Sequence, residues 1–306
     1  MLVTGALGCL GAWAVKAVLE DGDEPVGYDL GDATHRLELI LLPEERERLT
    51  LVRGDITDLG AVRRTLDEQE ITRVVHLAAL QVPFCRAAPV LGARVNVVGT
   101  VNVFEAVKER LDRIPGVAYA SSAAVYGPGD PSPAPESGGT APATFYGVTK
   151  LANEGTARLY WAESGVSSVG IRPYVVYGPG RDQGMTSGPT LAMEAAARGA
   201  GYEIPYGGSA QYDYAPAVGR AFLRAATPPE GALVANYPGA PASMSELVAA
   251  IEAAAPEIAG RISFADAPPP FPAELEAAAL ERALGPLGAP SLADGVRETV
   301  HHFRRA

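Results

Sequence analysis

Tyr146 and Lys150, two residues that could move a proton, stand four positions apart in the segment Phe145–Lys150. If the segment is helical, this spacing brings both side chains to one face of the helix. An ammonium group held near a phenol favours the phenolate, which lowers the pKa of the tyrosine toward working pH. Tyr146 is therefore a candidate general acid or base for moving a proton to or from an alcohol. Because the same pair also occurs on solvated helix faces, its meaning depends on the motifs that precede it.

The composition is that of an ordinary globular chain. Its 306 residues are 47% hydrophobic and 20% charged, which suits one large α/β domain or two unequal ones. We see no apolar run that approaches the length of a membrane span. The first residues, Met1–Gly5, lack the basic and long apolar regions of a signal peptide, so we expect a cytoplasmic protein.

Charge and cysteine content argue against several kinds of site. A net charge of −11 disfavours non-specific binding of nucleic acid, which needs a basic footprint. The two cysteines, Cys9 and Cys85, are too few for a disulfide framework or a zinc site. We therefore expect a small-molecule substrate, and no metal, membrane or nucleic-acid partner.

Short apolar runs alternate with longer amphipathic stretches, as in strands and helices around a parallel sheet. This pattern predicts an α/β fold with a Rossmann-type, doubly wound parallel sheet over residues 1–172 and a smaller C-terminal substrate-binding region over 173–306. A strand near 231–238 is expected to return to the main sheet. The predicted strands are Leu2–Thr4, Pro25–Asp29, Thr50–Arg53, Arg73–Leu77, Val117–Ser121 and Ser168–Arg172, and the predicted helices are Cys9–Glu20, Leu59–Glu68, Leu91–Leu111, Tyr146–Ala162, Glu246–Ala255 and Ala273–Leu284.

The first predicted strand runs into a glycine-rich turn. Gly5, Gly8 and Gly11 form a G-x-x-G-x-x-G pattern that encloses Cys9 and Leu10. Glycines permit a tight turn and a close approach of backbone to a pyrophosphate, and the next helix offers free N–H groups at its N-terminus. The alternative is an ordinary glycine-rich turn, but the strand–turn–helix context favours a dinucleotide site. Cys9 is interpreted as a small residue that fits there.

An acidic residue, Asp29, ends the second predicted strand. Its carboxylate can accept from both hydroxyls of an adenosine ribose and would repel a 2′-phosphate. The chain continues through Leu30–Asp32 without a basic residue. We therefore expect NAD rather than NADP as the cofactor, and we interpret Arg36 as a solvated loop arginine.

Two further strand ends carry residues suited to the adenosine. Asp55, followed by Ile56, could cap a turn or accept from the adenine amino group. His76 is interpreted as a histidine at the edge of the core. The residues after it leave room for a flat ligand: Leu77, Ala78 and Ala79.

A serine motif, Ser121–Gly127, follows the fifth predicted strand. It therefore lies at the same edge of the sheet as the glycine turn. A serine hydroxyl there can donate to a substrate oxygen while Tyr146 transfers the proton. Strand-end serines usually satisfy turns, so this motif gains its meaning from the glycine turn, Asp29 and the Tyr146/Lys150 pair.

With these motifs the chain resembles the extended short-chain dehydrogenase/reductase family, also called the NAD-dependent epimerase/dehydratase family. The resemblance covers most of residues 1–180. It rests on Gly5, Gly8 and Gly11, on Asp29, on Asp55 and Ile56, on His76–Ala79, on Asn96–Thr100, on Ser121–Gly127, on Tyr146 and Lys150, and on Arg172–Gly180.

The resemblance implies a role for each matching residue. Ser122, Tyr146 and Lys150 would carry catalysis, and Lys150 would also hold the nicotinamide ribose. The backbone from Pro173 to Val176 would contact the nicotinamide. Asn96 would lie near the lysine, and its simplest role there is to stabilise a helix. The implied reaction is hydride transfer at a substrate carbon coupled to proton transfer through Tyr146.

Departures from the family pattern bear on the substrate. Family members that dehydrate sugar nucleotides resemble one another in an Asp-Glu pair, where this chain has Ala123 and Ala124, so a dehydratase is disfavoured. Epimerases resemble one another in two diphosphate contacts. One is an asparagine shortly after the Arg-Pro strand, where this chain reads Tyr174–Val176, and the other is an arginine, where it has Tyr212. Burying a diphosphate without such partners is costly.

The remaining candidate for an anion is Arg181, which could grip a carboxylate or phosphate at two points or could be solvated. The segments Gln81–Phe84 and Met185–Ser187 are also expected to line the pocket. We thus predict substrate contacts from Gln81, Ser122, Ala123, Tyr146, Tyr174, Arg181 and Tyr212.

Three functions remain open. The first is an NAD-dependent oxidoreductase for a hydroxyl or carbonyl carbon of a small, sugar-like or acidic substrate. The second is a nucleotide-sugar 4-epimerase with tightly bound NAD, and the third is a catalytically idle NAD-binding scaffold. A scaffold has no need of the proton-transfer residues, which disfavours it. The resemblance also implies a homodimer, paired through the helices near Leu91–Leu111 and Tyr146–Ala162.

Overall fold

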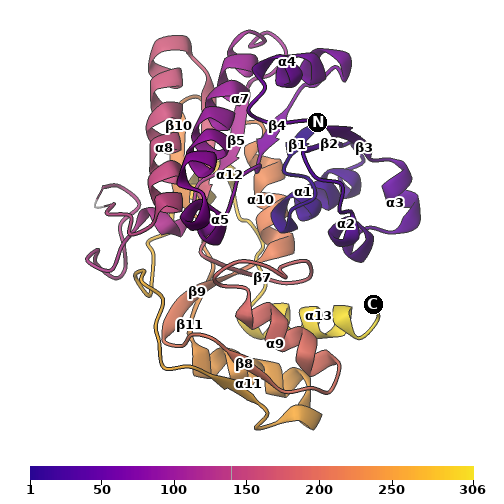
Figure 1. Ribbon diagram of the computed structural model, residues 1–306, viewed down its shortest axis with the longest axis vertical. Helices are drawn as coiled ribbons and strands as arrows, with labels where there is room; N and C mark the ends of the chain where they lie inside the picture. The colour runs from indigo at the N-terminus through magenta and orange to yellow at the C-terminus, as the bar shows by residue number, and fades with distance from the viewer. Residues whose placement is uncertain (139) are drawn as a thin grey trace.

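A seven-stranded parallel sheet forms the centre of the molecule (Figure 1). The structure, a computed structural model, describes residues 1–138 and 140–306. The strand order β10-β6-β5-β4-β1-β2-β3 has the chain winding outward from β1 in both directions, so the predicted doubly wound fold is confirmed. The strands are β1 (Leu2–Thr4), β2 (Val26–Asp29), β3 (Thr50–Arg53), β4 (Val74–His76), β5 (Gly116–Ala120), β6 (Ser167–Arg172) and β10 (Ala232–Asn236).

Helices cover both faces of this sheet, which is why most of its strands read as continuous apolar runs. Val3 and Val75 face a core shared with α1 (Cys9–Glu20) and α10 (Ala215–Ala225). The residues that precede them, Leu2 and Val74, face the opposite core. That core is completed by α4 (Leu59–Glu68), α7 (Gly99–Lys108) and α8 (Phe145–Ser164). Because the strands are parallel, their carboxyl ends meet at one edge, where the polar motifs gather.

The helix predicted over 91–111 consists of three consecutive pieces. These are α6 (Pro89–Ala93), a π-helical turn η1 (Arg94–Val98) and α7. By length and composition, Pro89–Lys108 could cross a membrane, which corrects our expectation that no apolar run reaches that length. Half of the most apolar stretch of this segment is buried inside the protein, and α7 packs against α4 and α8. This is the behaviour of a core helix.

A second, smaller part follows β6 and encloses a core of its own. In Figure 1 it lies below the main sheet. The chain runs back from it through α10, which packs against α1, and through β10, which joins the main sheet. Its strands are β7 (Val175–Tyr177), β9 (Ser209–Tyr214) and β11 (Ala240–Ser243) in one sheet and β8 (Tyr202–Ile204) and β12 (Ile262–Phe264) in another, and its helices are α9 (Gly188–Ala197), α11 (Met244–Ala254) and α13 (Leu292–Phe303).

Shorter helices complete the chain, and one of them corrects a prediction. The helix predicted over 273–284 forms only at its end, because the backbone of Glu274 and Glu276 bonds instead to Ala134. Leu275 packs beside Ala134 in a small core next to the serine motif. The short elements are α2 (His35–Ile40), α3 (Pro43–Glu47), α5 (Val82–Ala87), η2 (Ala123–Val125), η3 (Pro256–Ile258) and α12 (Ala279–Leu284).

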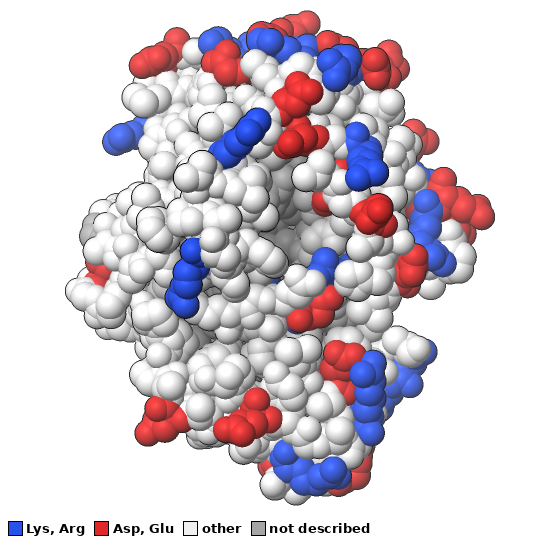
Figure 2. All heavy atoms as spheres, viewed as in Figure 1, with Lys and Arg blue, Asp and Glu red and all other residues white. Residues whose placement is uncertain are grey.

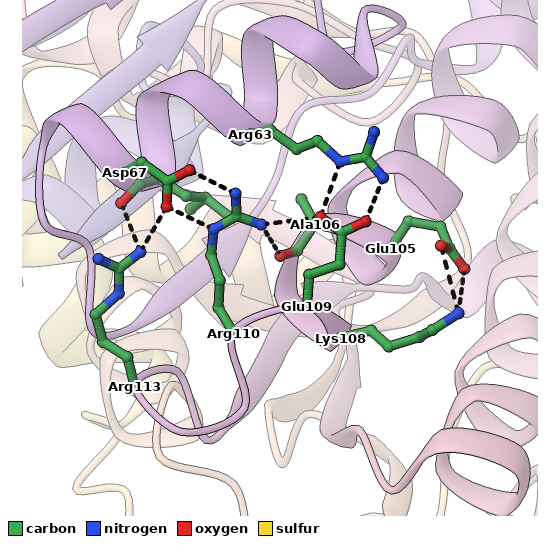
Figure 3. Close-up of polar contacts among 9 residues, drawn as sticks. Arg63, Asp67, Glu105, Ala106, Lys108, Glu109, Arg110 and Arg113 are labelled. Atoms are coloured by element: carbon green, nitrogen blue, oxygen red, sulfur yellow. Dashed lines mark hydrogen bonds and ion pairs between the residues drawn. The ribbon is translucent and has the colours of Figure 1, made fainter.

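An exposed network of ion pairs joins the ends of α4 and α7 (Figure 3). Arg110 donates to both oxygens of Asp67, at 2.7 and 2.6 Å, and Arg113 donates to the same carboxylate at 3.0 Å. The bonds from Arg110 are the largest cause that lowers the pKa of Asp67 to about 2. Arg63 pairs with Glu109 beside them. Because Asp67, the carboxylate that two arginines share, is 55% exposed, we assign the network a role in joining the two helices and no role in chemistry.

A buried ion pair lies beneath the carboxyl edge of the sheet. Arg172 at the end of β6 donates two bonds to Glu154 of α8, each 2.7 Å long, and both side chains are less than a tenth exposed. Arg172 also donates to the Tyr126 hydroxyl at 2.6 Å, and Ser121 donates to Glu154. This fixes α8 to the sheet at the level of the serine motif.

Removing one partner of this pair should destabilise the protein strongly. In the variant Glu154→Gln the Arg172 charge stays buried without its carboxylate, so we expect the free energy of unfolding to fall by about 3–5 kcal/mol. Arg198→Ala, which removes the exposed pair with Glu194, should change it by no more than about 1 kcal/mol. Urea denaturation measures both. Equal effects of the two variants would contradict this account.

Candidate active site

A cavity of about 510 Å³ opens at the carboxyl edge of the main sheet. Figure 2 shows the hollow near the middle of the visible face. Residues from the ends of β1, β2, β3, β4 and β5 and from the start of α8 line it. So do Pro173, Tyr174, Val176, Arg181, Met185, Thr186 and Phe271. The single cavity therefore runs from the glycine turn to the serine motif.

The glycine turn fits a diphosphate. Gly5 has a positive φ of 70°, and a Cβ at this position would lie 2.7 Å from the Ala78 nitrogen. A Cβ on Gly11 would lie 2.0 Å from the Gly5 carbonyl oxygen. Gly8 is the N-cap of α1 and has no side chain that could accept a hydrogen bond. No capping side chain therefore bonds the first N–H groups of the helix, which leaves them for a ligand. Gly8, Cys9, Leu10 and Gly11 all line the cavity.

Asp29 lies at the cavity wall with its carboxylate held in place. Its two oxygens accept from the backbone nitrogens of Leu7 at 3.0 Å and Gly31 at 3.1 Å. Asp55 accepts from the Thr57 nitrogen at 2.8 Å, so it caps a turn and also lines the cavity. The other predicted adenosine neighbours line the same wall: Ile56, Leu77, Ala78 and Ala79.

The structure resolves two open interpretations at this end. His76 bridges the hydroxyls of Thr4 and Thr100 at 2.7 and 3.0 Å, and burial lowers its pKa to about 3, so it is a neutral core histidine. Burial raises the pKa of Cys9 to about 12. Its thiol therefore stays protonated, consistent with a small residue that fits the turn.

Ser122, Tyr146 and Lys150 meet at the other end of the cavity. The Lys150 ammonium donates to the Ala120 carbonyl oxygen at 2.8 Å and lies 5.5 Å from the centre of the Tyr146 ring. The Ser122 hydroxyl accepts from the Ala124 nitrogen at 3.1 Å and is a hydrogen-bond partner of Tyr146. Ser121 instead faces the buried Glu154. The geometry thus supports Ser122, although the catalytic roles of all three residues stay a prediction.

The structure corrects the expected electrostatics of this trio. Burial raises the pKa of Tyr146, while the hydrogen bond with Ser122 and the charge of Arg181 lower it. The charge of Arg181 thus acts on the phenol, and the Lys150 ammonium lies near its ring. Burial also lowers the pKa of Lys150, to about 8. In the protein alone, Tyr146 is thus a protonated phenol at neutral pH.

Asn96 lies behind the cavity and not on its wall. Its side-chain oxygen accepts from the Leu80 nitrogen at 2.7 Å, and its amide donates to the Leu80 carbonyl and the Thr149 hydroxyl. Direct cofactor contact is therefore not supported. Asn96 instead fixes the loop after β4 to the helix that carries Lys150.

At the substrate end, one predicted contact is misplaced. Tyr212 is buried in the second core, where its hydroxyl meets the Met244 sulfur at 3.9 Å, and it does not line the cavity. The reason is that β9 pairs with β7 and β11 and turns this side chain away from the cavity. The other predicted cofactor and substrate contacts here do line it: Gln81, Ala123, Pro173, Tyr174 and Arg181.

Several residues that line the cavity were not predicted. Phe271 follows a run of three prolines and packs edge-on against Tyr174, with ring centres 6.0 Å apart. Arg36 is held by Asp182 and is not a solvated loop arginine. The sequence around a proline run or a lone arginine does not indicate a site. The contacts of Phe271 with Tyr174 and of Arg36 with Asp182 each join segments that are far apart in the chain.

Fold and site together define an NAD-dependent oxidoreductase. The residues at the glycine turn and Asp29 would hold the dinucleotide, and Ser122, Tyr146 and Lys150 stand where a substrate hydroxyl or carbonyl would enter. Among the described residues, no cluster of His, Cys, Asp or Glu is placed to hold a metal ion.

Comparison with known proteins assigns the chain to a family. The family model described as the NAD dependent epimerase/dehydratase family matches residues 1–232, and the chain belongs to this family. The resemblance drawn from the motifs is therefore confirmed. The enzyme is an NAD-dependent dehydrogenase, reductase or epimerase of the extended short-chain dehydrogenase/reductase type.

Individual relatives include several epimerases. A UDP-glucose 4-epimerase of Mycolicibacterium smegmatis is 33% identical over 318 residues and covers 99% of this chain and 98% of its own. UDP-glucuronate 4-epimerase 5 of Arabidopsis thaliana is 35% identical over 58% of this chain, but the match spans only 42% of that protein. The structure of a Thermus thermophilus UDP-glucose 4-epimerase with NAD is 26% identical, with a TM-score of 0.80 over 100% of this chain and 99% of its own.

The glycine turn offers a direct test of cofactor binding. In Gly11→Ala the added methyl group collides with the Gly5 carbonyl, so the turn must open, and we expect NAD binding measured by calorimetry to be lost. Gly155→Ala on α8 is the matched control, because nothing lies within 4 Å of its added Cβ. It should keep NAD affinity and stabilise the helix by about 0.5–1 kcal/mol. Unchanged affinity in Gly11→Ala would refute this assignment.

Proposed function

We propose that this protein is a net NAD-dependent dehydrogenase or reductase for a small hydroxy or carbonyl compound with one acidic group. The observation that carries the proposal is the extent of the cavity. Among the described residues, nothing between Thr186 and Phe271 lines it. Tyr212, at the position where the family resemblance expects a diphosphate-binding arginine, is packed in the second core. On the described cavity wall a nucleoside diphosphate therefore lacks the arginine partner expected at that position.

The charges on the cavity wall support the same substrate class. Its cationic residues, within the described ranges, are Arg36, Lys150 and Arg181. Arg36 is paired with Asp182, and Lys150 is bound to the Ala120 carbonyl. Arg181 is left to meet a ligand. One guanidinium matches one carboxylate, whereas a buried diphosphate needs more than one partner.

In the described part of the chain, two polar atoms around Arg181 lack a hydrogen-bond partner. Its Nη2 donates to the Thr186 hydroxyl at 3.3 Å, and its Nε is buried without a hydrogen-bond partner. The side-chain oxygen of Gln81 is also buried without one. A Cβ on Gly184 would lie 2.5 Å from that oxygen and 3.0 Å from Arg181 Nη2, so the three residues are in contact. Buried polar atoms of this kind ordinarily have partners, and a substrate could supply them only if these side chains turned toward the cavity.

The protein's own residues would share the work of the reaction. Tyr146 would exchange a proton with the substrate oxygen, and Ser122 would donate a hydrogen bond to that oxygen. Tyr174 and Phe271 would close the cavity against water. When bound, NAD supplies the acceptor or donor of the hydride.

A second candidate is a nucleotide-sugar 4-epimerase. It is favoured by the Mycolicibacterium smegmatis relative, which aligns over 99% of this chain. In such an enzyme NAD stays bound and no net NADH appears. Copurified, tightly held NAD would support this alternative, and a cofactor that dialyses away would count against it.

We also propose that the protein is a cytoplasmic homodimer without nucleic-acid or membrane partners. Large apolar side chains are exposed on neighbouring helices: Val90 (85%), Leu91, Val98, Phe145, Val148 and Leu159. Figure 2 shows few charged side chains on the side of the molecule formed by α5 and α8. A second copy would bury these side chains. Free Cys9 and Cys85 suit a reducing compartment, and the net charge of −11 disfavours nucleic acid.

A substrate panel tests the proposed function. The protein with NAD is offered small hydroxy acids, sugar acids and polyols, and the absorbance of NADH is followed. We expect NADH from at least one hydroxy acid and from no neutral polyol at equal concentration. Silence across the panel, together with interconversion of UDP-galactose and UDP-glucose without net NADH, would establish the epimerase instead.

Arg181 should govern the affinity for the acidic substrate found in that panel. Arg181→Leu removes a charged two-point contact worth about 2 kcal/mol, so we expect KM to rise by about 30-fold or more while NAD affinity stays unchanged. Arg181→Lys should restore only part of it. A KM for the acid that is unaffected by Arg181→Leu would remove the basis for an acidic substrate.

Tyr146 should give opposite pH profiles in the two directions of the reaction. Because its pKa is raised, oxidation needs a phenolate that forms only as pH rises, so kcat/KM should increase on the alkaline side. Reduction needs the phenol, so its kcat/KM should be high at neutral pH and fall on the alkaline side. Tyr146→Phe should lower kcat by about 10²–10⁴-fold in both directions. Full activity in Tyr146→Phe would exclude this role.

A further inference from the structure

An ion pair joins the cofactor end of the cavity to the substrate half of the chain. Arg36 of α2 donates to Asp182 from Nε at 3.0 Å and from Nη2 at 2.6 Å. It also donates to the carbonyls of Gly180 at 3.2 Å and Leu7 at 3.0 Å. His35 adds a contact to the second Asp182 oxygen at 2.9 Å. The guanidinium is thus neutralised, and each of its three nitrogens donates to a protein oxygen.

Arg36 is also a cation close to the ribose-binding carboxylate. So is Arg53, which pairs in register with Asp29 across β2 and β3 and donates to the Leu30 carbonyl at 3.3 Å. Asp29 accepts from the nitrogen of Leu7, and Arg36 donates to the oxygen of the same residue. Both side chains line the cavity. A 2′-phosphate on the adenosine ribose would therefore arrive beside Asp29, within the neighbourhood of Arg36. An arginine in such a place can hold a 2′-phosphate when it is free to turn toward it.

We propose that Asp182 is a second determinant of the preference for NAD over NADP, acting by holding Arg36. Asp29 repels the 2′-phosphate, and Asp182 keeps the Arg36 guanidinium from compensating that repulsion. The loop that carries Asp182 is itself fixed, because Trp13 of α1 donates to the Pro179 carbonyl at 2.8 Å. The Arg36 side chain is only 14% exposed, so release from Asp182 would leave its charge in need of another anion.

Binding measurements in an Asp29→Ser background isolate this effect from the repulsion by Asp29. Dissociation constants for NADPH and NADH are measured by fluorescence titration in Asp29→Ser and in Asp29→Ser/Asp182→Asn. We expect the second substitution to tighten NADPH binding by about 10-fold or more and to change NADH binding by less than about 3-fold. NADH binding also reports that the variant is folded, and Asp182→Ser serves as the second variant if Asp182→Asn is unstable.

The control is the same pair of proteins with Arg36→Leu added. If Arg36 provides the new phosphate contact, the gain in NADPH affinity disappears with it. An NADPH affinity that does not respond to Asp182→Asn or Asp182→Ser would overturn the proposal. So would a gain that survives Arg36→Leu, since it would then reflect only the loss of one negative charge.

Discussion

The burial of the Lys150 ammonium at the carboxyl edge of the sheet is the constraint on which the site depends. Burial opposes the charge and lowers its pKa to about 8, while the carboxylate of Glu154 favours the charged form. Its direct partner is the Ala120 carbonyl at the end of β5. This contact fixes α8 to β5, and one helical turn earlier Tyr146 meets Ser122, which follows the same strand. The buried Glu154–Arg172 pair holds the next turn of α8 in the same way.

The loop between β7 and α9 links the two ends of the cavity. Two adjacent residues of opposite charge in this loop, Arg181 and Asp182, contact different ends of the cavity. Asp182 turns toward the cofactor end and pairs with Arg36, whereas Arg181 lines the substrate end beside Thr186. This arrangement leaves one cation for the substrate. Membership of the family alone does not identify the substrate of this chain. The placement of Arg181 is the feature of this chain from which we infer the substrate class.

Local signals made much of the main sheet and the cofactor end predictable. The bounds of β1, α1, β3 and α4 match the sequence prediction. The spacing of the apolar residues, the glycine turn and the Asp58 N-cap can each be recognised within a few neighbouring residues. The same motifs located the glycine turn, Asp29 and the Tyr146/Lys150 pair. Contacts that join distant segments were not predictable. Asp182 holds Arg36 across 146 positions, Phe271 reaches the cavity from a proline run, and the pairing of β9 turned Tyr212 into the second core.

The direction of a pKa was also beyond the sequence. A spacing of four placed Lys150 near Tyr146, but only the fold shows that burial is the largest influence on the pKa of the phenol and raises it, while the charge of Arg181 opposes that rise. The sequence shows which ionisable groups the protein has. Packing determines how far each group is removed from water, and this desolvation shifts its pKa.

We propose that the cavity accepts a small acid and not a nucleoside diphosphate. The most direct measurement is titration calorimetry of the NAD-loaded protein with UDP. The account predicts no saturable binding at millimolar UDP, because Tyr212 and its neighbours fill the second core and Arg181 is the one cation left for a ligand on the described cavity wall. Saturable binding of UDP in the micromolar range would contradict it.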